Sequence, residues 1–227
     1  MRQIHKQAEP DAFVRWKAAK DEQIKRMIAD GKSGGEIWGL LQGSLSQDIV
    51  PDDYSKAMLR ECLVIEQFFL CCYCNDALKG GQLDTIIEHF LPKKHYKAEI
   101  FNYANLLAAC NGGERVKPIE LSCGSEKDSN DPTVIAFVSP FDQDAHQHFS
   151  YTPRGEIIGK STEGIETIAF LNLNCKRLQL RREAVIEEYI YDETETIDAQ
   201  IAEVLAPVDG KLQAFCMAIA DVLNGYR

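Results

Sequence analysis

The sequence predicts an α+β fold, mostly helical, in which N- and C-terminal helical extensions surround a small metal-bound core. Thiols fall into two separated groups, CCYC at 71–74 and then Cys110 and Cys123. Between these groups, Thr85–Phe90 is β-branched at its centre and is followed closely by Pro92, as is typical of a short strand. Segments on both sides place apolar residues at helical spacing, which predicts the flanking helices.

Length and composition allow one domain of ordinary size, or a small module wrapped by helices, because the 227 residues are 45% hydrophobic. We divide the chain into an N-terminal helical region at 1–65, a metal-bound core at 66–132 and a C-terminal region at 133–227. The last region is expected to hold short strands and then helices, and to pack with the core as one compact unit.

The net charge of −10 argues against a nucleic-acid-binding protein, unless basic residues cluster locally or a partner supplies a basic surface. No apolar window approaches the roughly 18 residues that a membrane span needs, and no secretory signal is visible. We therefore expect a cytoplasmic protein with no membrane contact. Eight cysteines in such a chain indicate reduced thiols that bind metal, rather than disulfides.

The N-terminal region is predicted to form two helices joined by a short apolar segment. Residues 10–31 have helical spacing, with Pro10 suited to the first turn and Gly31 to the end. The segment EIWGLLQGS then packs into the core. The second helix is predicted to start at the Pro-Asp-Asp sequence of 51–53 and to continue through YSKAMLRECLVI.

The core region is predicted as a strand, FFLCCYCNDAL, that enters a tight thiol turn, followed by the strand at Thr85–Phe90. Lys97–Cys110 is apolar at roughly helical spacing and is predicted as a helix that ends in a sharp turn. Residues 111–133 are rich in Gly, Ser, Asn and Pro, which predicts a loop.

The C-terminal region is predicted as a strand at Val134–Val138 and then two short strands, HFSYT and EIIGK, joined by a turn. A helical or extended segment follows at Glu166–Leu171. Two helices are expected within 171–205, with Leu178 and Leu180 among their core positions. The chain is predicted to close with an amphipathic helix at 212–227.

Four thiols have the spacing of a zinc site. Cys71 and Cys74 form a C-x-x-C pair, which lets two thiolates reach one ion from a single turn. Cys72 offers a C-x-C alternative, but the two-residue spacer favours Cys71. Cys110 and Cys123 would complete four thiolate ligands. The alternative interpretation is a set of ordinary reduced cysteines without a metal.

Glu88 and His89 are neighbours at the end of the predicted strand, so their side chains point to opposite faces. Next to a metal, such a carboxylate can bind a hard cation while the imidazole faces a substrate. A single histidine after a strand is more often structural, but the flanking thiols favour a catalytic role here. The amide of Asn105 is a candidate for orienting the histidine, with Asn102 as the runner-up.

The order Cys-x-x-Cys, Glu-His-Phe-x-Pro-Lys, Asn-Leu-Leu-x-x-Cys and Cys-Gly-x-x-Lys resembles the HNH endonuclease superfamily with a zinc-knuckle ββα-metal core. More narrowly, it resembles the PtuB-like HNH proteins of Septu anti-phage systems and their retron-associated relatives. The opening MRQIHKQAEP and the stretch VSPFDQDAHQHFSYTPRGEI are also similar to that group, so the resemblance covers most of residues 1–160.

The resemblance implies a role for each matched residue. His89 would be the base that activates water for attack on a phosphodiester, Glu88 would bind Mg²⁺ or another divalent cation, and Asn105 would be the middle asparagine of the signature. Lys93 and Lys127 would contact phosphate oxygens of the substrate. The knuckle thiols, which would bind a structural Zn²⁺, are Cys71, Cys74, Cys110 and Cys123.

One position departs from the signature, whose last member is a His or Asn near the second knuckle. Here Ser122 and Gly124 flank Cys123, and neither is a good ligand. We assign the place to Asp128. The alternatives are Asn130, Asp131 and His95.

The resemblance also implies partners: an ABC-type ATPase (PtuA-like) in a defence complex, a nucleic acid substrate, and retron RNA or DNA reached through the complex. The C-terminal helices would either dock the ATPase or only cover the core. The sequence therefore predicts a metal-dependent endonuclease that is the effector of an anti-phage defence system. The alternatives are a zinc-stapled adaptor or nucleic-acid-binding module without cleavage, and a metalloprotein that uses Glu88 and His89 for another hydrolysis.

Overall fold

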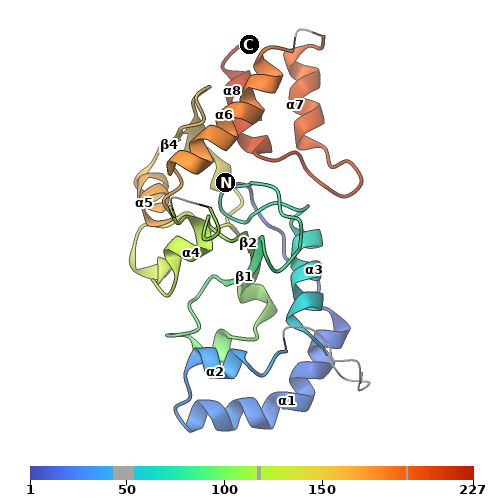
Figure 1. The fold of residues 1–227 in the computed structure, drawn as a ribbon, viewed down its shortest axis with the longest axis vertical. Coiled ribbons are helices and arrows are strands. Elements are labelled where there is room, and N and C mark those ends of the chain that lie inside the picture. Colours follow the sequence, from blue (N-terminus) through green and yellow to red (C-terminus); the bar gives the residue numbers. More distant parts are fainter. Residues whose placement is uncertain (43–53, 117–118, 193) are drawn as a thin grey trace.

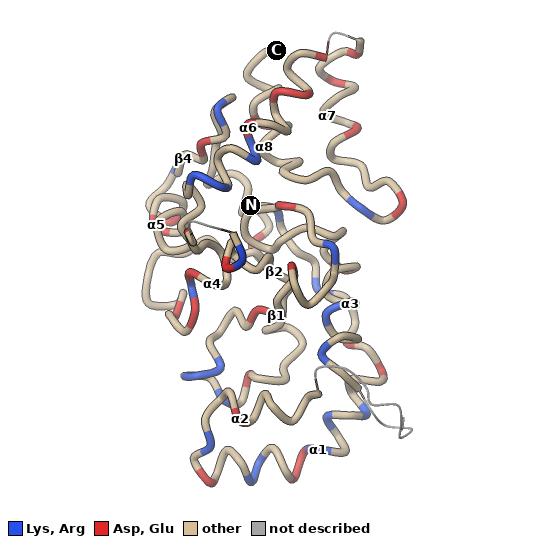
Figure 2. Tube along the Cα trace, viewed as in Figure 1, with Lys and Arg blue, Asp and Glu red and all other residues tan. Residues whose placement is uncertain are grey.

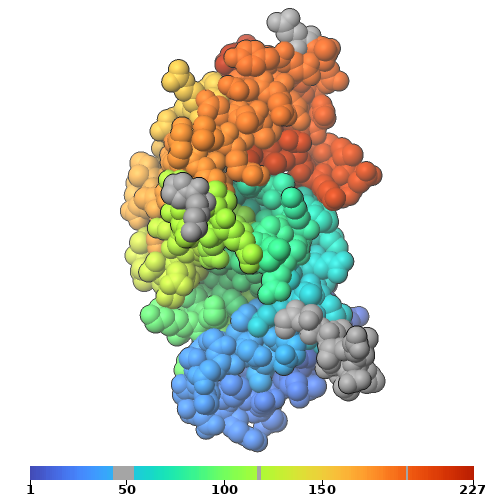
Figure 3. All heavy atoms as spheres, in the orientation of Figure 1, coloured from blue at the N-terminus to red at the C-terminus, as the bar shows by residue number. Residues whose placement is uncertain are grey.

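A computed structural model describes residues 1–42, 54–116, 119–192 and 194–227. These residues form an α+β fold with two small antiparallel sheets, which confirms the α+β part of the predicted class. The N-terminal helices lie at one end of an elongated molecule, the hairpin of β1 and β2 lies in the middle, and the C-terminal helices lie at the other end (Figure 1). The same order is visible on the surface (Figure 3).

The N-terminal helix is confirmed as α1 (Asp11–Ala29), which begins directly after Pro10. Acidic and basic residues are interleaved along this helix (Figure 2). Helix α2 (Gly34–Trp38) starts with a capping box in which Ser33 and Glu36 bond each other's backbone amides. Helix α3 (Lys56–Glu66) is capped by Ser55. The predicted helix start at 51–53 lies outside the described residues.

The central sheet pairs β1 (Thr85–His89) with β2 (Leu106–Cys110), with Thr85 opposite Cys110 and His89 opposite Leu106. The predicted strand is confirmed, but the helix predicted over Lys97–Cys110 is wrong. That stretch forms the 3₁₀ turns η1 (Lys97–Glu99) and η2 (Tyr103–Asn105) and then β2. Every residue of β2 is buried. In a short run that is apolar on both faces, hydrophobic periodicity does not distinguish a strand from a helix.

The strand predicted over FFLCCYCNDAL is also wrong. Phe68, Phe69 and Asn75 have φ angles of 55°, 62° and 60°, so the chain turns twice instead of extending. The segment docks on the free edge of β2 through a side chain: the amide of Gln67 donates to Ala108 O at 2.8 Å and accepts from Ala108 N at 2.7 Å. Gln67 thus takes the place of a neighbouring strand, which fixes the thiol turn beside β2.

Helix α4 (Cys123–Lys127) interrupts the segment that is predicted as a loop. The strand predicted at Val134–Val138 is wrong. Its backbone amides donate to side chains of a helix and not to a neighbouring strand. The 3₁₀ turn η3 (Pro132–Val134) comes first, and then Val138 N donates to Thr167 Oγ1 at 2.8 Å.

The C-terminal region follows the prediction more closely. After η4 (Ala145–His148), β3 (Phe149–Tyr151) pairs with β4 (Ile157–Gly159). The helices are α5 (Thr162–Phe170), α6 (Lys176–Ile190), α7 (Ile197–Leu205) and α8 (Cys216–Asn224). Leu178 is buried as predicted, whereas Leu180 is 48% exposed and faces solvent. Within the described residues, no helix is long and apolar enough to cross a membrane.

Candidate functional site

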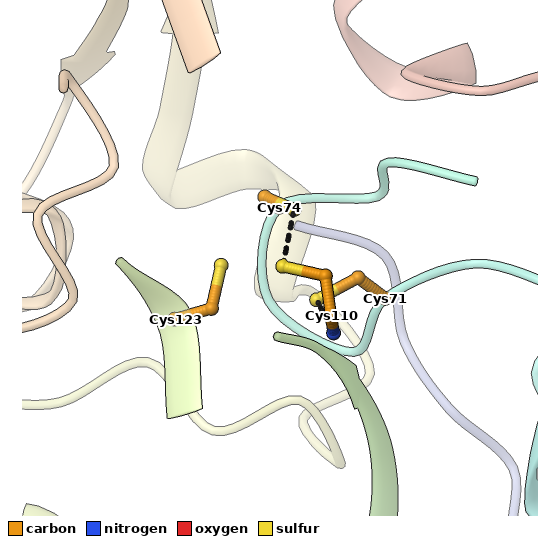
Figure 4. Close-up of side chains that lie close together, drawn as sticks. All are labelled: Cys71, Cys74, Cys110 and Cys123. Atoms are coloured by element: carbon orange, nitrogen blue, oxygen red, sulfur yellow. Dashed lines mark hydrogen bonds between the residues drawn. The ribbon is translucent and has the colours of Figure 1, made fainter. Parts of the chain in front are cut away.

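Four cysteine sulfur atoms gather at one point in the middle of the molecule. The Sγ atoms of Cys71, Cys74, Cys110 and Cys123 all lie within 4.8 Å of one another, and those of Cys74 and Cys110 are 4.0 Å apart (Figure 4). A tetrahedral zinc site with bonds of about 2.3 Å has edges of about 3.8 Å. The four cysteines can therefore hold a metal ion such as zinc.

The thiol turn is shaped by backbone bonds that also point amides at sulfur. Cys110 N lies 3.3 Å from Cys71 Sγ, and Asp76 N lies 3.5 Å from Cys74 Sγ. Such amides stabilise thiolate charge. Cys72 is buried next to Cys71 but is not one of the four clustered thiols, and its backbone N donates to Ala108 O. The structure thus brings together the predicted C-x-x-C pair and not the C-x-C alternative.

Electrostatics in the cluster favour a cation. A hydrogen bond with the neighbouring sulfur of Cys110 is the main cause that raises the pKa of Cys74 and of Cys123, and repulsion between adjacent thiolates adds to it. Burial raises the pKa of Cys72 well above its usual value, which keeps that thiol neutral. A divalent cation among the four clustered thiols would offset the repulsion and bind the thiolate forms.

Helix α6 anchors both halves of the cluster, and the sequence does not predict this. Arg181 pairs with Asp76 at 2.7 Å, next to the thiol turn. Arg177 donates to Ser122 Oγ at 2.6 Å, next to the start of α4. Both arginines lie on one helix four residues apart, so the C-terminal region helps to hold the thiol turn and α4 together.

An open cleft of about 580 Å³ lies between β1, α2, α4 and the segment after β1. Glu88, His89, Lys93 and Asp128 all line it, so four of the predicted site residues come together. Glu114 lines it as well and is not predicted from the sequence.

His89 lies at the end of β1, in the cleft wall. Its Nε2 is 3.1 Å from Ile100 O, and because a carbonyl can only accept, the proton lies on Nε2 and the lone pair on Nδ1. The Trp38 ring packs edge-on against the imidazole at 4.6 Å. Burial, with a further contribution from Lys93, lowers the pKa of His89 to about 3. The imidazole is therefore neutral and can accept a proton at Nδ1.

Glu88 is held from two sides within the fold. Its Oε1 accepts from the Tyr73 hydroxyl at 3.1 Å and pairs with Lys127 Nζ at 2.9 Å. Burial raises the pKa of Glu88, and Lys127 opposes this shift. Oε2 lies against Gly124, where a Cβ would come within 2.7 Å of it. Residue 124 is a glycine where the HNH signature would have a ligand nearby, and the carboxylate of Glu88 occupies the space that a side chain at this position would need.

Lys127 does not occupy the position expected for a phosphate contact. Its side chain is fully buried, and Nζ donates to His89 O at 2.9 Å as well as pairing with Glu88. Because Lys127 lies one helical turn after Cys123, the thiol cluster places it. It supports the carboxylate and the histidine backbone from beneath the cleft. Lys93 does line the cleft, and its contact with phosphate stays a prediction.

Asn105 acts on the loop after β1 and not on the histidine ring. Its Oδ1 accepts from Leu91 N at 2.7 Å, and its Nδ2 donates to Leu91 O and to Glu99 O. The direct partner of the imidazole is Ile100 O, one residue after Glu99. Asn105 therefore positions the segment that carries this carbonyl. The runner-up, Asn102, caps η2.

Asp128 is exposed at the end of α4, where its φ of 47° turns the chain out of the helix. It lines the cleft, whereas Asn130, Asp131 and His95 do not. Asp131 instead accepts from the Tyr96 hydroxyl and caps η3. Of these four residues, Asp128 is therefore the one that lines the cleft together with Glu88.

Lys127→Met is expected to destabilise the protein by about 3–5 kcal/mol, because it leaves the carboxylate of Glu88 buried without its partner. Denaturant unfolding would measure the loss. Lys94→Met is the matched control, since Lys94 is exposed and should change stability by less than about 0.5 kcal/mol. Adding Glu88→Gln should recover part of the loss. If Lys127→Met is as stable as Lys94→Met, the buried pair does not hold the site.

Gly34→Ala is expected to push α2 away from the cleft. A Cβ on Gly34 would lie 2.1 Å from Lys93 O, whereas one on Gly35 would meet nothing closer than 4.0 Å. We expect Gly34→Ala to cost about 1–3 kcal/mol and Gly35→Ala to be neutral or slightly stabilising. Thermal unfolding of the two variants measures the difference. Equal melting temperatures would contradict this close packing.

No protein-family model matches this sequence, and no curated protein matches it either. The functional interpretation therefore depends on the geometry of the cysteine cluster and of the cleft beside it.

Proposed function

We propose that the chain is a metal-dependent HNH endonuclease that hydrolyses phosphodiester bonds. The observation that supports this most is the placement of Glu88 and His89 at the end of β1, in a cleft that α4 closes. Strand, strand and short helix follow one another in the order expected of a ββα-metal core, and the cysteine cluster brings the end of β2 to the start of α4. A neutral imidazole with a lone pair on Nδ1, beside carboxylates in an open cleft, can accept a proton from water that attacks a phosphate.

Two sets of side chains would hold the metals that this function needs. Carboxylate oxygens of Glu88 and Asp128 are donors that Mg²⁺ prefers, and four thiolates suit a structural Zn²⁺. When bound, the Mg²⁺ ion stabilises negative charge on the phosphate and on the leaving oxygen. His89 Nδ1 takes the proton of the attacking water. Ile100 O keeps the imidazole in the required tautomer, and Lys93 attracts the phosphate.

Two observations favour a second function, an adaptor or nucleic-acid-binding module without cleavage. Oε1 of Glu88 is already engaged by Lys127 and Tyr73, so only Oε2 remains for a cation. Residue 124 also contributes no side chain to the metal site. This second function needs the zinc but neither Mg²⁺ nor the imidazole.

We also propose a cytoplasmic ABC-type ATPase as the partner in an anti-phage complex. The net charge of −10 supports this, because a strongly acidic chain attracts a polyanion poorly by itself. A basic groove on the ATPase would deliver the substrate, whether DNA, RNA or the nucleic acid of a retron.

The test is a cleavage assay on duplex DNA, single-stranded DNA and structured RNA, with the zinc-loaded protein alone and with the partner ATPase. Cleavage that requires Mg²⁺ and stops with EDTA is the expected result. Binding without cleavage under every condition would support the adaptor instead. Neither binding nor cleavage, with the partner present, would contradict both functions.

A further inference from the structure

A second hollow, of about 430 Å³, lies between α3 and residues 79–82 and shares no lining residue with the cleft of His89. Its walls combine apolar side chains, two cationic side chains and the exposed carboxylate of Glu61. Val64 and Phe69 form part of the apolar wall, and Ile65 beside them is 56% exposed. Arg60 and Lys79 supply two positive charges.

Arg60 is the unusual member of this hollow, because it is buried without a counter-charge. Arg60 is only 8% exposed, and its buried Nε has no hydrogen-bond partner. Among the described residues, none of its guanidinium nitrogens makes a hydrogen bond or an ion pair. A buried charge is normally paired, because removing it from water is costly.

Two other arginines of the chain have close acceptors, although Nε of the half-buried Arg177 also has no hydrogen-bond partner. Arg182 donates to Leu173 O and Leu178 O, and Arg181 pairs with Asp76. The carboxylate that most favours the charge on Arg60 is that of Asp84, but it is engaged locally. Its Oδ2 accepts from Lys79 N at 2.6 Å and from Thr85 Oγ1 at 3.0 Å. The guanidinium of Arg60 therefore lacks a close anionic partner within the described fold.

We propose that this hollow binds an anionic group, a carboxylate or a phosphate, that is carried on a small apolar body. Arg60 is the counter-charge, since its planar guanidinium matches the oxygens of either anion in pairs. Lys79 adds a second charge at the rim, and Val64 and Phe69 take the apolar body. The site is separate from the proposed nuclease cleft and does not depend on the proposed function.

The test measures binding of phenyl phosphate and benzoate to the zinc-loaded full chain, by calorimetry and by thermal unfolding. Phenol and inorganic phosphate are the controls, since each has only one half of the proposed ligand. We expect at least one aromatic anion to raise the melting temperature more than both controls. The arm that binds tighter, phosphate or carboxylate, identifies the anion. Equal responses to phenol and to the anions would overturn the proposal.

Arg60→Met distinguishes a ligand-binding arginine from a structural one. We expect roughly tenfold or greater weakening of anion binding, with a ligand-free melting temperature that is unchanged or higher, because an unpaired buried charge is removed. Arg26→Met, on the exposed face of α1, should keep the response. Lys79→Met at the rim should weaken binding without affecting folding. A lower ligand-free melting temperature for Arg60→Met, or undiminished binding in both hollow variants, would overturn the proposal.

Discussion

Replacing Cys74 with serine is expected to release the metal ion and to destabilise the whole core. Cys74 lies in the thiol turn, Cys110 at the end of β2 and Cys123 at the start of α4, so one ion links segments that are far apart in the sequence. Structural zinc contributes an apparent binding free energy of about 10–16 kcal/mol, comparable to the about 5–15 kcal/mol that stabilises a whole domain. Metal analysis should fall from about one zinc per chain toward none, and the melting temperature should drop sharply.

Cys72→Ala is the matched control, because Cys72 is a buried neighbour whose sulfur is not part of the cluster. It should keep the zinc and lose only packing, at a cost of about 1 kcal/mol. A chelator should destabilise Cys72→Ala as strongly as the unchanged protein and should have little further effect on Cys74→Ser. Undiminished zinc content in Cys74→Ser would contradict the assignment of this ligand.

The approach of Cys71 and Cys74 to one point was predictable from spacing, because a C-x-x-C pair needs only one turn to present two thiolates. Strand β2 was not predictable, because its character comes from its surroundings. The side chain of Gln67 satisfies its free edge, and helices α3 and α4 contact it, so both faces are buried. The local sequence pattern of β2 contains no information about these contacts.

In the cleft as well, some residues were predictable from the sequence and others were not. Glu88 and His89 were identifiable as adjacent polar residues at a strand end, but Lys127 was expected at the surface, where lysines usually lie. Its spacing of four residues from Cys123 was the available signal, since i and i+4 share one helix face and Cys123 faces the core. The contacts of Arg177 and Arg181 beside the cluster depend on how α6 packs, and residue spacing in the sequence does not predict this packing.

His89→Ala is expected to lower Mg²⁺-dependent cleavage by about 10²–10⁴-fold, the usual contribution of a general base. Nδ1 carries the lone pair because Nε2 donates to Ile100 O, and the alanine has neither atom. The rate of phosphodiester hydrolysis with saturating Mg²⁺ and partner ATPase measures the loss. His146→Ala, at an exposed histidine outside the cleft, should cleave normally. Zinc content should stay near one per chain in both variants.

A structural role of His89 would also reduce activity, so the decisive measurement is rescue. Removing the ring leaves space beside Trp38, which packs against it in the fold. Added imidazole should enter this space and restore part of the cleavage in His89→Ala, because it supplies the missing base. More Mg²⁺ should not help that variant, but it should partly restore Asp128→Asn, in which only a metal ligand is weakened. Full cleavage by His89→Ala without imidazole would show that another group accepts the proton.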